Sequence, residues 1–179
     1  MNAAAPALMA DRQPAARAVS ALRERLQELM RLVLTLPEEA YCARPSRRSG
    51  SVGEHVRHTL DHISSLVGAH PSATLSYDHR SRGTAVETDP GMAVREMMRL
   101  DGALDRWSDR TLDEPVAVSA VTSADGGSVI GWSTLARELA FVMAHTVHHQ
   151  AIVALLLERL DADVPDERFG YAPSTPRRA

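Results

Sequence analysis

The chain has 179 residues, of which 44% are hydrophobic and 4% aromatic, and a formal net charge of −3 at pH 7. That length is enough to bury a core within one domain without disulfides. With so few aromatic residues, Leu, Ala, Val and Met must pack the core, which is typical of helical bundles rather than β-sandwiches. The slightly acidic balance provides no basic field for nucleic acid.

We expect one domain over residues 1–179, with residues 1–14 flexible and residues 161–179 forming an irregular tail. The Ala- and Pro-rich start, "MNAAAPALMADRQPAAR", lacks the charged and apolar regions of a secretory signal. No apolar run approaches the length of a membrane span. The single cysteine, Cys42, excludes an internal disulfide and says little about compartment. A cytoplasmic protein without a membrane partner is therefore expected.

The first predicted helix has apolar residues at alternating steps of three and four, which form one stripe. These residues are Val19, Leu22, Leu26, Leu29, Val33 and Leu36. Pro37 ends the helix, and the segment from there to residue 50 is predicted as a loop. A second helix begins at Ser51, because Ser51 and Glu54 have the spacing of a capping box, and it ends near Gly68.

Residues 71–89 are polar and lack periodicity, so they predict a long connection, and such ordered loops are often functional. Asp89 and Pro90 then predict the N-cap and first residue of a third helix. Residues 114–132 contain a "DGG" turn signal between alternating residues, which predicts a short β-hairpin. The last helix is predicted over residues 133–160. The sum is an all-α fold, an antiparallel four-helix bundle.

Six of the eight histidines lie in the second and last predicted helices. In the last helix, His149 lies roughly 40° from the centre of the apolar stripe, His145 about 80° and His148 about 140°. His145 and His149, spaced i, i+4, are therefore predicted to face a partner helix and to bind one metal ion together. His148 is predicted to point away.

The second helix supplies the third ligand of such a site, since "EHVRHTLDH" places three histidines along one side of it. Helix angles favour His55 or His62 over His58 as this ligand. Neutral imidazole suits Zn, Ni, Cu or Fe(II), and the sequence does not choose among them. A metal-free helical scaffold with polar core histidines is the alternative.

Two motifs resemble the DinB-like, or YfiT-like, superfamily of metalloenzymes. "SVGEHVRHTLDH" is similar to its second-helix segment, in which the ligand histidine lies seven residues after the Ser, and this selects His58. "AHTVHHQA" resembles its last-helix pattern, H-x-x-x-H followed by Arg or Gln, and this selects His145 and His149. Whether His55 or His62 replaces or joins His58 stays open.

The resemblance implies an up-down-down-up bundle, a homodimer and a divalent metal ion, most commonly Zn or Ni, held by three histidines with open positions. Relatives of known activity include S-transferases that use low-molecular-weight thiols and a thiol-dependent maleylpyruvate isomerase. It therefore predicts a metal-dependent transferase, with a hydrolase second. The alternative is a non-catalytic, dimeric metal-binding protein of stress-related or unknown role, which a closed site with His62 as fourth ligand would favour.

Five further residues are candidates for the site. Ligand imidazoles normally donate their second N–H to a carboxylate or carbonyl, and Glu138 and Asp61 are the nearest carboxylates in sequence. Arg80 and Arg82, together with His79, are candidates for binding an anionic group of a small-molecule substrate. Tyr171 and the tail are expected either to cover the site or to pack on the bundle.

Overall fold

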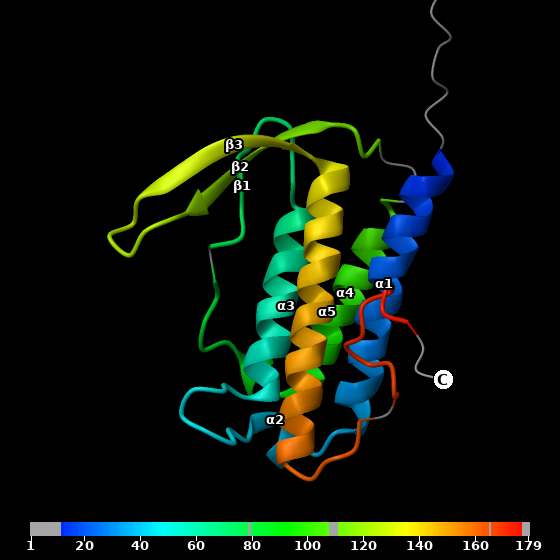
Figure 1. Ribbon diagram of the computed structural model, residues 1–179, viewed down its shortest axis with the longest axis vertical. Coiled ribbons are helices and arrows are strands. Elements are labelled where there is room, and N and C mark those ends of the chain that lie inside the picture. Colours follow the sequence, from blue (N-terminus) through cyan, green and yellow to red (C-terminus); the bar gives the residue numbers. More distant parts are fainter. Residues whose placement is uncertain (1–11, 79, 108–110, 165, 177–179) are drawn as a thin grey trace, which may run out of the picture.

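The computed structural model describes residues 12–78, 80–107, 111–164 and 166–176, and the chain is mostly helical with a small sheet (Figure 1). The helices are α1 (Arg12–Thr35), α2 (Glu38–Cys42), α3 (Val52–Val67), the 3-10 helix η1 (Ala85–Glu87), α4 (Pro90–Asp105) and α5 (Leu135–Arg159). The strands are β1 (Leu75–Ser76), β2 (Pro115–Val121) and β3 (Ser128–Thr134). Of the segment predicted as flexible, residues 1–11 lie outside the description, whereas residues 12–14 already belong to α1.

Polar caps determine where three of the helices begin. The Ser51 side chain accepts a hydrogen bond from the Glu54 N–H, and the Glu54 side chain accepts one from the Ser51 N–H, so the predicted capping box is confirmed. Asp89 accepts from the Met92 N–H ahead of Pro90, as predicted for the third long helix. The last helix begins at Leu135 because its cap is Thr134.

The segment after α1 was predicted as a loop, and this was wrong, because it contains the short helix α2. Glu38 and Glu39 lie in its first turn, where their negative charges interact favourably with the positive end of the helix dipole. Tyr41 is buried, and its hydroxyl donates to the Val86 carbonyl at 2.6 Å. A helix this short is not stable alone, so this tertiary contact, which local sequence does not reveal, holds it in place.

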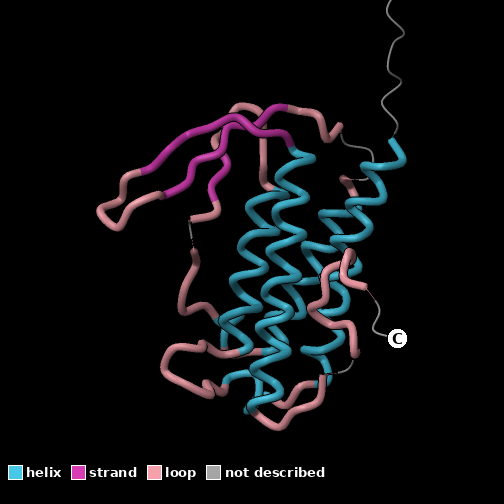
Figure 2. Tube along the Cα trace, in the orientation of Figure 1, coloured by secondary structure: helices cyan, strands magenta, loops and turns pink. Residues whose placement is uncertain are grey.

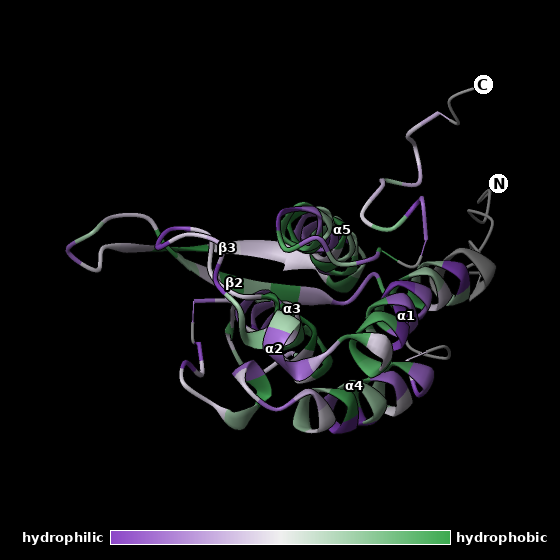
Figure 3. Ribbon diagram, turned by 90° about the horizontal axis from the view of Figure 1, so that it is seen from below, coloured by the Kyte–Doolittle hydropathy of each residue, from purple (hydrophilic) through white to green (hydrophobic). Residues whose placement is uncertain are grey.

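The four long helices pack around one core. Helices α1 and α3 each pack against both α4 and α5, and viewed from one end the four enclose largely apolar faces (Figure 3). Figure 1 shows α3 and α5 side by side and running in opposite directions. From α5, the apolar residues buried in this core include Leu135, Leu139, Val142, Val153 and Leu157.

The predicted hairpin is confirmed as antiparallel β2 and β3, with Val118 opposite Gly131. The sheet is larger than predicted, because β1 from the long connection pairs in parallel with β2, placing Leu75 beside Val118. The three strands lie across one end of the long helices, and the hairpin extends beyond them (Figure 2). Burial of Leu75 and Val116 anchors this sheet on the helices.

Helix α5 has the length and mean hydropathy of a membrane-spanning helix, so the expectation that no segment approaches a span was wrong. Its 25 residues pack against α1 and α3, as expected of the core helix of a globular domain. Length and composition alone are therefore weak evidence for a membrane span here.

Candidate metal centre

Histidines from α3 and α5 meet where these two antiparallel helices pack together. The Nε2 atoms of His58 and His145 lie 3.1 Å apart, although the residues are 87 positions apart in the sequence. His62 joins them: one ring nitrogen from each of His58, His62 and His145 lies within 4.8 Å of the others. The rings of His62 and His145 are stacked, with centroids 3.9 Å apart.

His149 lies beside the same cluster, one helical turn along α5. Its ring centroid is 4.6 Å from that of His58 and 4.5 Å from that of His145. Its Nδ1 lies 3.0 Å from the Nδ1 of His55, which brings a fifth histidine to the group. We call His55, His58, His62, His145 and His149 the histidine cluster.

The exposure of the α5 histidines follows the predicted helix angles. His149 is buried, His145 is partly buried and His148 is exposed. On α3, His62 is the most buried of the three histidines, as its angle suggested, yet His58 also faces the cluster. Helix angles favoured His62 as a third ligand and the family resemblance selected His58, and both residues lie in the histidine cluster.

Burial keeps His58, His62, His145 and His149 neutral. It lowers the pKa of His58 to about 3, with further lowering by the neighbouring His62 and Arg80. Burial, followed by His62, lowers the pKa of His145 to about 4. Burial, followed by His145 and His58, lowers the pKa of His149 to about 2, and burial also lowers the pKa of His62. At pH 7 these rings are thus in the form that binds metal ions.

The donor set fits a transition-metal ion. Two imidazole nitrogens bound to one ion through bonds of about 2.0–2.1 Å lie roughly 2.8–3.4 Å apart, for angles from octahedral to tetrahedral. The 3.1 Å between His58 Nε2 and His145 Nε2 falls within this range. In addition, the Nδ1 of His58 is buried and has no hydrogen-bond partner among the described residues.

An aromatic wall closes one side of the cluster, and it was not predicted from the sequence. Tyr77 stacks on His62 with centroids 5.1 Å apart and planes 8° apart, and Phe141 packs on both Tyr77 and His145. The available signal for Phe141 was its position four residues before His145 on one helix face. Tyr77 had none, because it lies in the long connection.

The carboxylates predicted to orient the histidines have other partners. Asp61 pairs with Arg57 at 2.7 Å. Glu138 is buried and accepts hydrogen bonds from Ser133 and Arg137. Burial, followed by the charge of Glu138, raises the pKa of Tyr77 well above its usual range. The Tyr77 hydroxyl and the Glu138 side chain therefore lie close enough to interact beside the aromatic wall. In place of carboxylates, backbone carbonyls contact His62 and His55.

The predicted substrate-binding arginines both lie in the exposed part of the long connection. Arg80 is close enough for its charge to lower the pKa of His58, His62 and His145. No such effect on the cluster is seen for Arg82, and His79 lies outside the described residues. In the tail, Phe169 is buried and Tyr171 is about half exposed.

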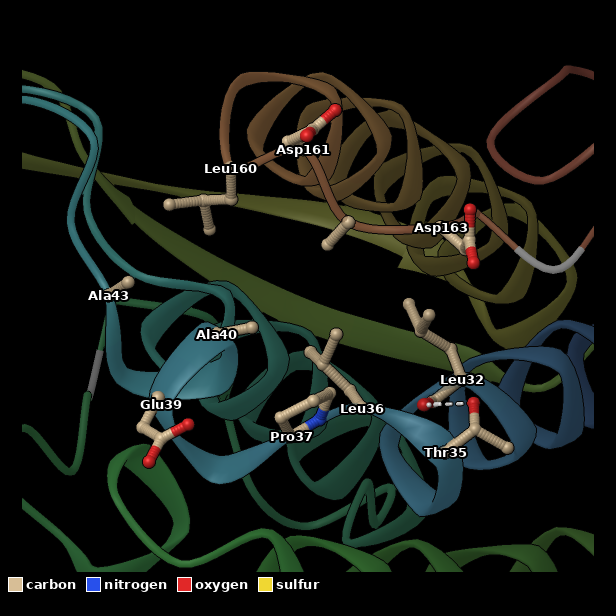
Figure 4. Close-up of a pocket in the computed structure, with 11 residues that line it drawn as sticks. Leu32, Thr35, Leu36, Pro37, Glu39, Ala40, Ala43, Leu160, Asp161 and Asp163 are labelled. Carbon is tan, nitrogen blue, oxygen red and sulfur yellow. Dashed lines mark hydrogen bonds between the residues drawn. The ribbon is translucent and has the colours of Figure 1, made fainter.

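A cavity of about 700 Å³ lies away from the cluster, between the end of α1, α2 and the residues that follow α5 (Figure 4). Its lining is apolar around Leu32, Leu36 and Leu160 and acidic at Glu39, Asp161 and Asp163. None of the lining residues is a histidine. The cavity and the candidate chemistry therefore do not coincide.

Comparison with known proteins adds two findings. The sequence profile of the DinB superfamily matches residues 21–153 of this chain, which include the whole histidine cluster. FK506-binding protein 5 of Rhizopus delemar is 32% identical over 110 residues, and the match takes in 59% of this chain but only 28% of that protein. No solved structure matches the chain.

Proposed function

The chain belongs to the DinB superfamily, and on that premise we propose that it is a divalent-metal-dependent enzyme that catalyses a thiol-dependent S-transferase-type reaction. The observation that carries this proposal is the meeting of neutral, buried or partly buried histidines from α3 and α5, with the Nε2 atoms of His58 and His145 3.1 Å apart. We propose zinc or nickel as the ion, the metals that the family resemblance implies, and imidazole donors suit either of them.

His58, His145 and His149 are the proposed ligands, and His62 is placed to join them. Neutral imidazoles bring no charge of their own, so the full positive charge of the ion would act on whatever else binds to it.

When bound, a divalent ion lowers the pKa of a thiol and makes the thiolate available at neutral pH. In an S-transfer, the thiol loses its proton and its sulfur forms a bond to an electrophilic carbon of the second substrate. The leaving group departs with the bonding electron pair and takes up a proton. A low-molecular-weight thiol is the proposed co-substrate, and hydrolysis, in which water replaces the thiol, is the second choice.

Arg80 is proposed to bind an anionic group of the substrate. It is exposed, and its charge is felt by three histidines of the cluster, so it lies near the site while it remains accessible. A guanidinium binds carboxylates and phosphates through paired hydrogen bonds. Arg82 is the weaker candidate, since its charge has no such effect on the cluster.

The test is made on protein purified without a His-tag. We expect close to one equivalent of transition metal by elemental analysis, and a rise in melting temperature when Zn or Ni is added to metal-free protein. Metal-dependent turnover of a panel of thiols with an electrophilic acceptor would support the enzyme. Less than about one-tenth of an equivalent, with no thermal shift, would overturn the metal proposal.

The second candidate is a non-catalytic metal-binding protein, and His62 is the observation that favours it. Structural zinc sites take four protein ligands and leave no open position. If His62 binds together with the three proposed ligands, a substrate cannot reach the ion. Stoichiometric metal without turnover in the thiol panel, and four imidazole ligands by X-ray absorption, would favour this function.

We also propose that the four long helices form the superfamily's up-down-down-up antiparallel bundle, and that the protein is a cytoplasmic homodimer. Strand β3 is the proposed interface, because among the described strands it pairs only with β2 and has a free edge. Residues 115–134 contain one charged residue, Asp125, although the chain as a whole is 24% charged. A second copy could thus pair along β3 about a twofold axis without like charges meeting.

A further inference from the structure

His55 contacts two groups, one through each ring nitrogen. Its Nε2 lies 2.9 Å from the Ser49 carbonyl oxygen, and its Nδ1 lies 3.0 Å from the Nδ1 of His149. Ser49, His55 and His149 therefore form one continuous chain of hydrogen bonds that runs from a backbone carbonyl to the histidine cluster.

The carbonyl determines which nitrogen of each ring carries the proton. A carbonyl oxygen can only accept, so the Nε2 of His55 must be the N–H donor. In a neutral ring the other nitrogen of His55 then has a lone pair and accepts from the Nδ1 of His149. The N–H of His149 is thereby on Nδ1, and its lone pair is on Nε2.

The loop before α3 holds the carbonyl in place for this contact. Ser49 donates from its backbone to the Ser46 carbonyl, and its hydroxyl also bonds there at 3.1 Å. The next residue, Gly50, has a φ of +71°, a left-handed conformation that favours glycine. A Cβ at Gly50 would lie 3.3 Å from the Nε2 of His55, so a larger residue would crowd this contact.

We infer that His55 is a positioning residue, which holds the His149 ring and fixes its tautomer so that the Nε2 lone pair is available to a metal ion. The inference rests on the proposed metal-dependent function. It assigns His55 a role without making it a ligand, because both of its nitrogens are already engaged. Such outer hydrogen bonds orient metal-bound histidines and raise their basicity.

The tautomer of His62 is fixed in the same way, by a different backbone carbonyl. Its Nδ1 lies 3.1 Å from the backbone carbonyl of His58, so in the neutral ring Nδ1 carries the proton and Nε2 the lone pair. Two histidines of the cluster, on different helices, are thus both held in the tautomer that offers Nε2.

The first test uses metal-free, ¹⁵N-labelled full-length protein at neutral pH. Long-range ¹H–¹⁵N NMR spectra distinguish the two histidine tautomers. We expect His149 to carry its proton on Nδ1 and His55 on Nε2. A His149 ring protonated on Nε2 would overturn the inference, and this result does not depend on whether any metal binds.

The second test measures zinc affinity by competition with a chelator. His55→Ala should weaken binding about 10–100-fold, the usual loss on removing an outer partner of a ligand. His55→Asn keeps an acceptor near the Nδ1 position and should restore most of the affinity. His148→Ala, which removes an exposed neighbouring histidine, is the matched control and should bind like wild type.

Equal affinity in wild type and His55→Ala would contradict the role of His55 while leaving the proposed metal site intact. Failure of wild-type protein to bind zinc or nickel would instead overturn the proposed function. Melting of each metal-free variant, compared with wild type, separates loss of affinity from loss of folding.

Discussion

At the scale of single residues, the proposed chemistry depends on imidazoles that burial and crowding keep neutral. Their burial, and to a smaller extent their mutual proximity, disfavours the charged form, which lowers the pKa of His58, His145 and His149. At low pH, holding these rings in the neutral form lowers the stability of the folded protein. A metal cation bound to their lone pairs would instead stabilise the neutral form.

The ligand assignment predicts distinct results for three alanine variants. His58→Ala and His149→Ala should each lose more affinity for Zn or Ni than the roughly 10–100-fold expected for an outer partner. His148→Ala should bind normally, since its ring is exposed. Isothermal titration of the metal-free proteins measures this. Loss of metal from His148→Ala, with His149→Ala unaffected, would show that the assignment is wrong.

The lowered pKa values predict that metal-free protein loses stability in acid. Below pH 6.5 the unfolded histidines take up protons, whereas folded His58 and His145 do so only near pH 3 and 4. The unfolded state then binds more protons, so the free energy of unfolding falls as the pH decreases from about 6.5 to about 4. Urea unfolding at a series of pH values measures this.

His145→Ala removes one of these groups and should flatten the pH dependence of stability. His148→Ala serves as the control and should leave the slope as in wild type. A wild-type stability that stays constant between pH 7 and pH 4.5 would be inconsistent with buried, neutral histidines.

At the scale of elements, the start of α3 is the point where the site is fastened to the rest of the fold. Arg57, buried next to His58, pairs with Asp61 on its own helix and with Glu87 of η1. The Tyr41 hydroxyl of α2 donates a hydrogen bond to the Val86 carbonyl, which also belongs to η1. These contacts hold the end of the long connection against α3, so the connection is ordered there by residues distant in sequence.

Gly53 is predicted to be essential for this contact. A Cβ at Gly53 would overlap the Glu87 carbonyl oxygen and lie 2.6 Å from a ring carbon of Tyr41, and both neighbours are packed. Gly53→Ala should therefore lower the free energy of unfolding by about 1–3 kcal/mol or more, despite the higher helix propensity of alanine. Thermal or urea unfolding measures the change.

Gly102 in α4 is the matched control, since a Cβ there would meet nothing within 4 Å. Gly102→Ala should be neutral or stabilising by up to about 1 kcal/mol. If Gly53→Ala were as stable as Gly102→Ala, the close approach of η1 to α3 would not exist in solution.

At the scale of the whole molecule, the hairpin is the feature that a globular monomer does not need. It extends beyond the helices (Figure 1), and Ile130 and Trp132, on one face of β3, are 71% and 80% exposed. Exposed apolar side chains on a free, uncharged edge strand favour pairing with another strand.

The proposed dimer predicts that a charge on this strand gives a monomer. In Ile130→Lys, like charges would meet across the twofold axis, so light scattering after gel filtration should show the mass of one chain, and wild type the mass of two. Leu34→Lys adds the same charge at an exposed position of α1 and should stay dimeric. A dimeric Ile130→Lys, or a monomeric wild type at high concentration, would rule out β3 as the interface.

Sequence periodicity and the predicted caps at Ser51 and Asp89 were sufficient to locate the four long helices, because apolar stripes and caps act within a few residues. The same local geometry separated His145 and His149 from His148. It could not find α2, β1 or Tyr77, since each is held by partners far along the chain. On α3, helix angles favoured His55 or His62 over His58, yet His58 also lies at the cluster, because α3 meets more than one neighbour. Only the packing of α3 on α5 brings His58, His62 and His55 to the histidines of α5, since contacts over some ninety residues depend on the whole core.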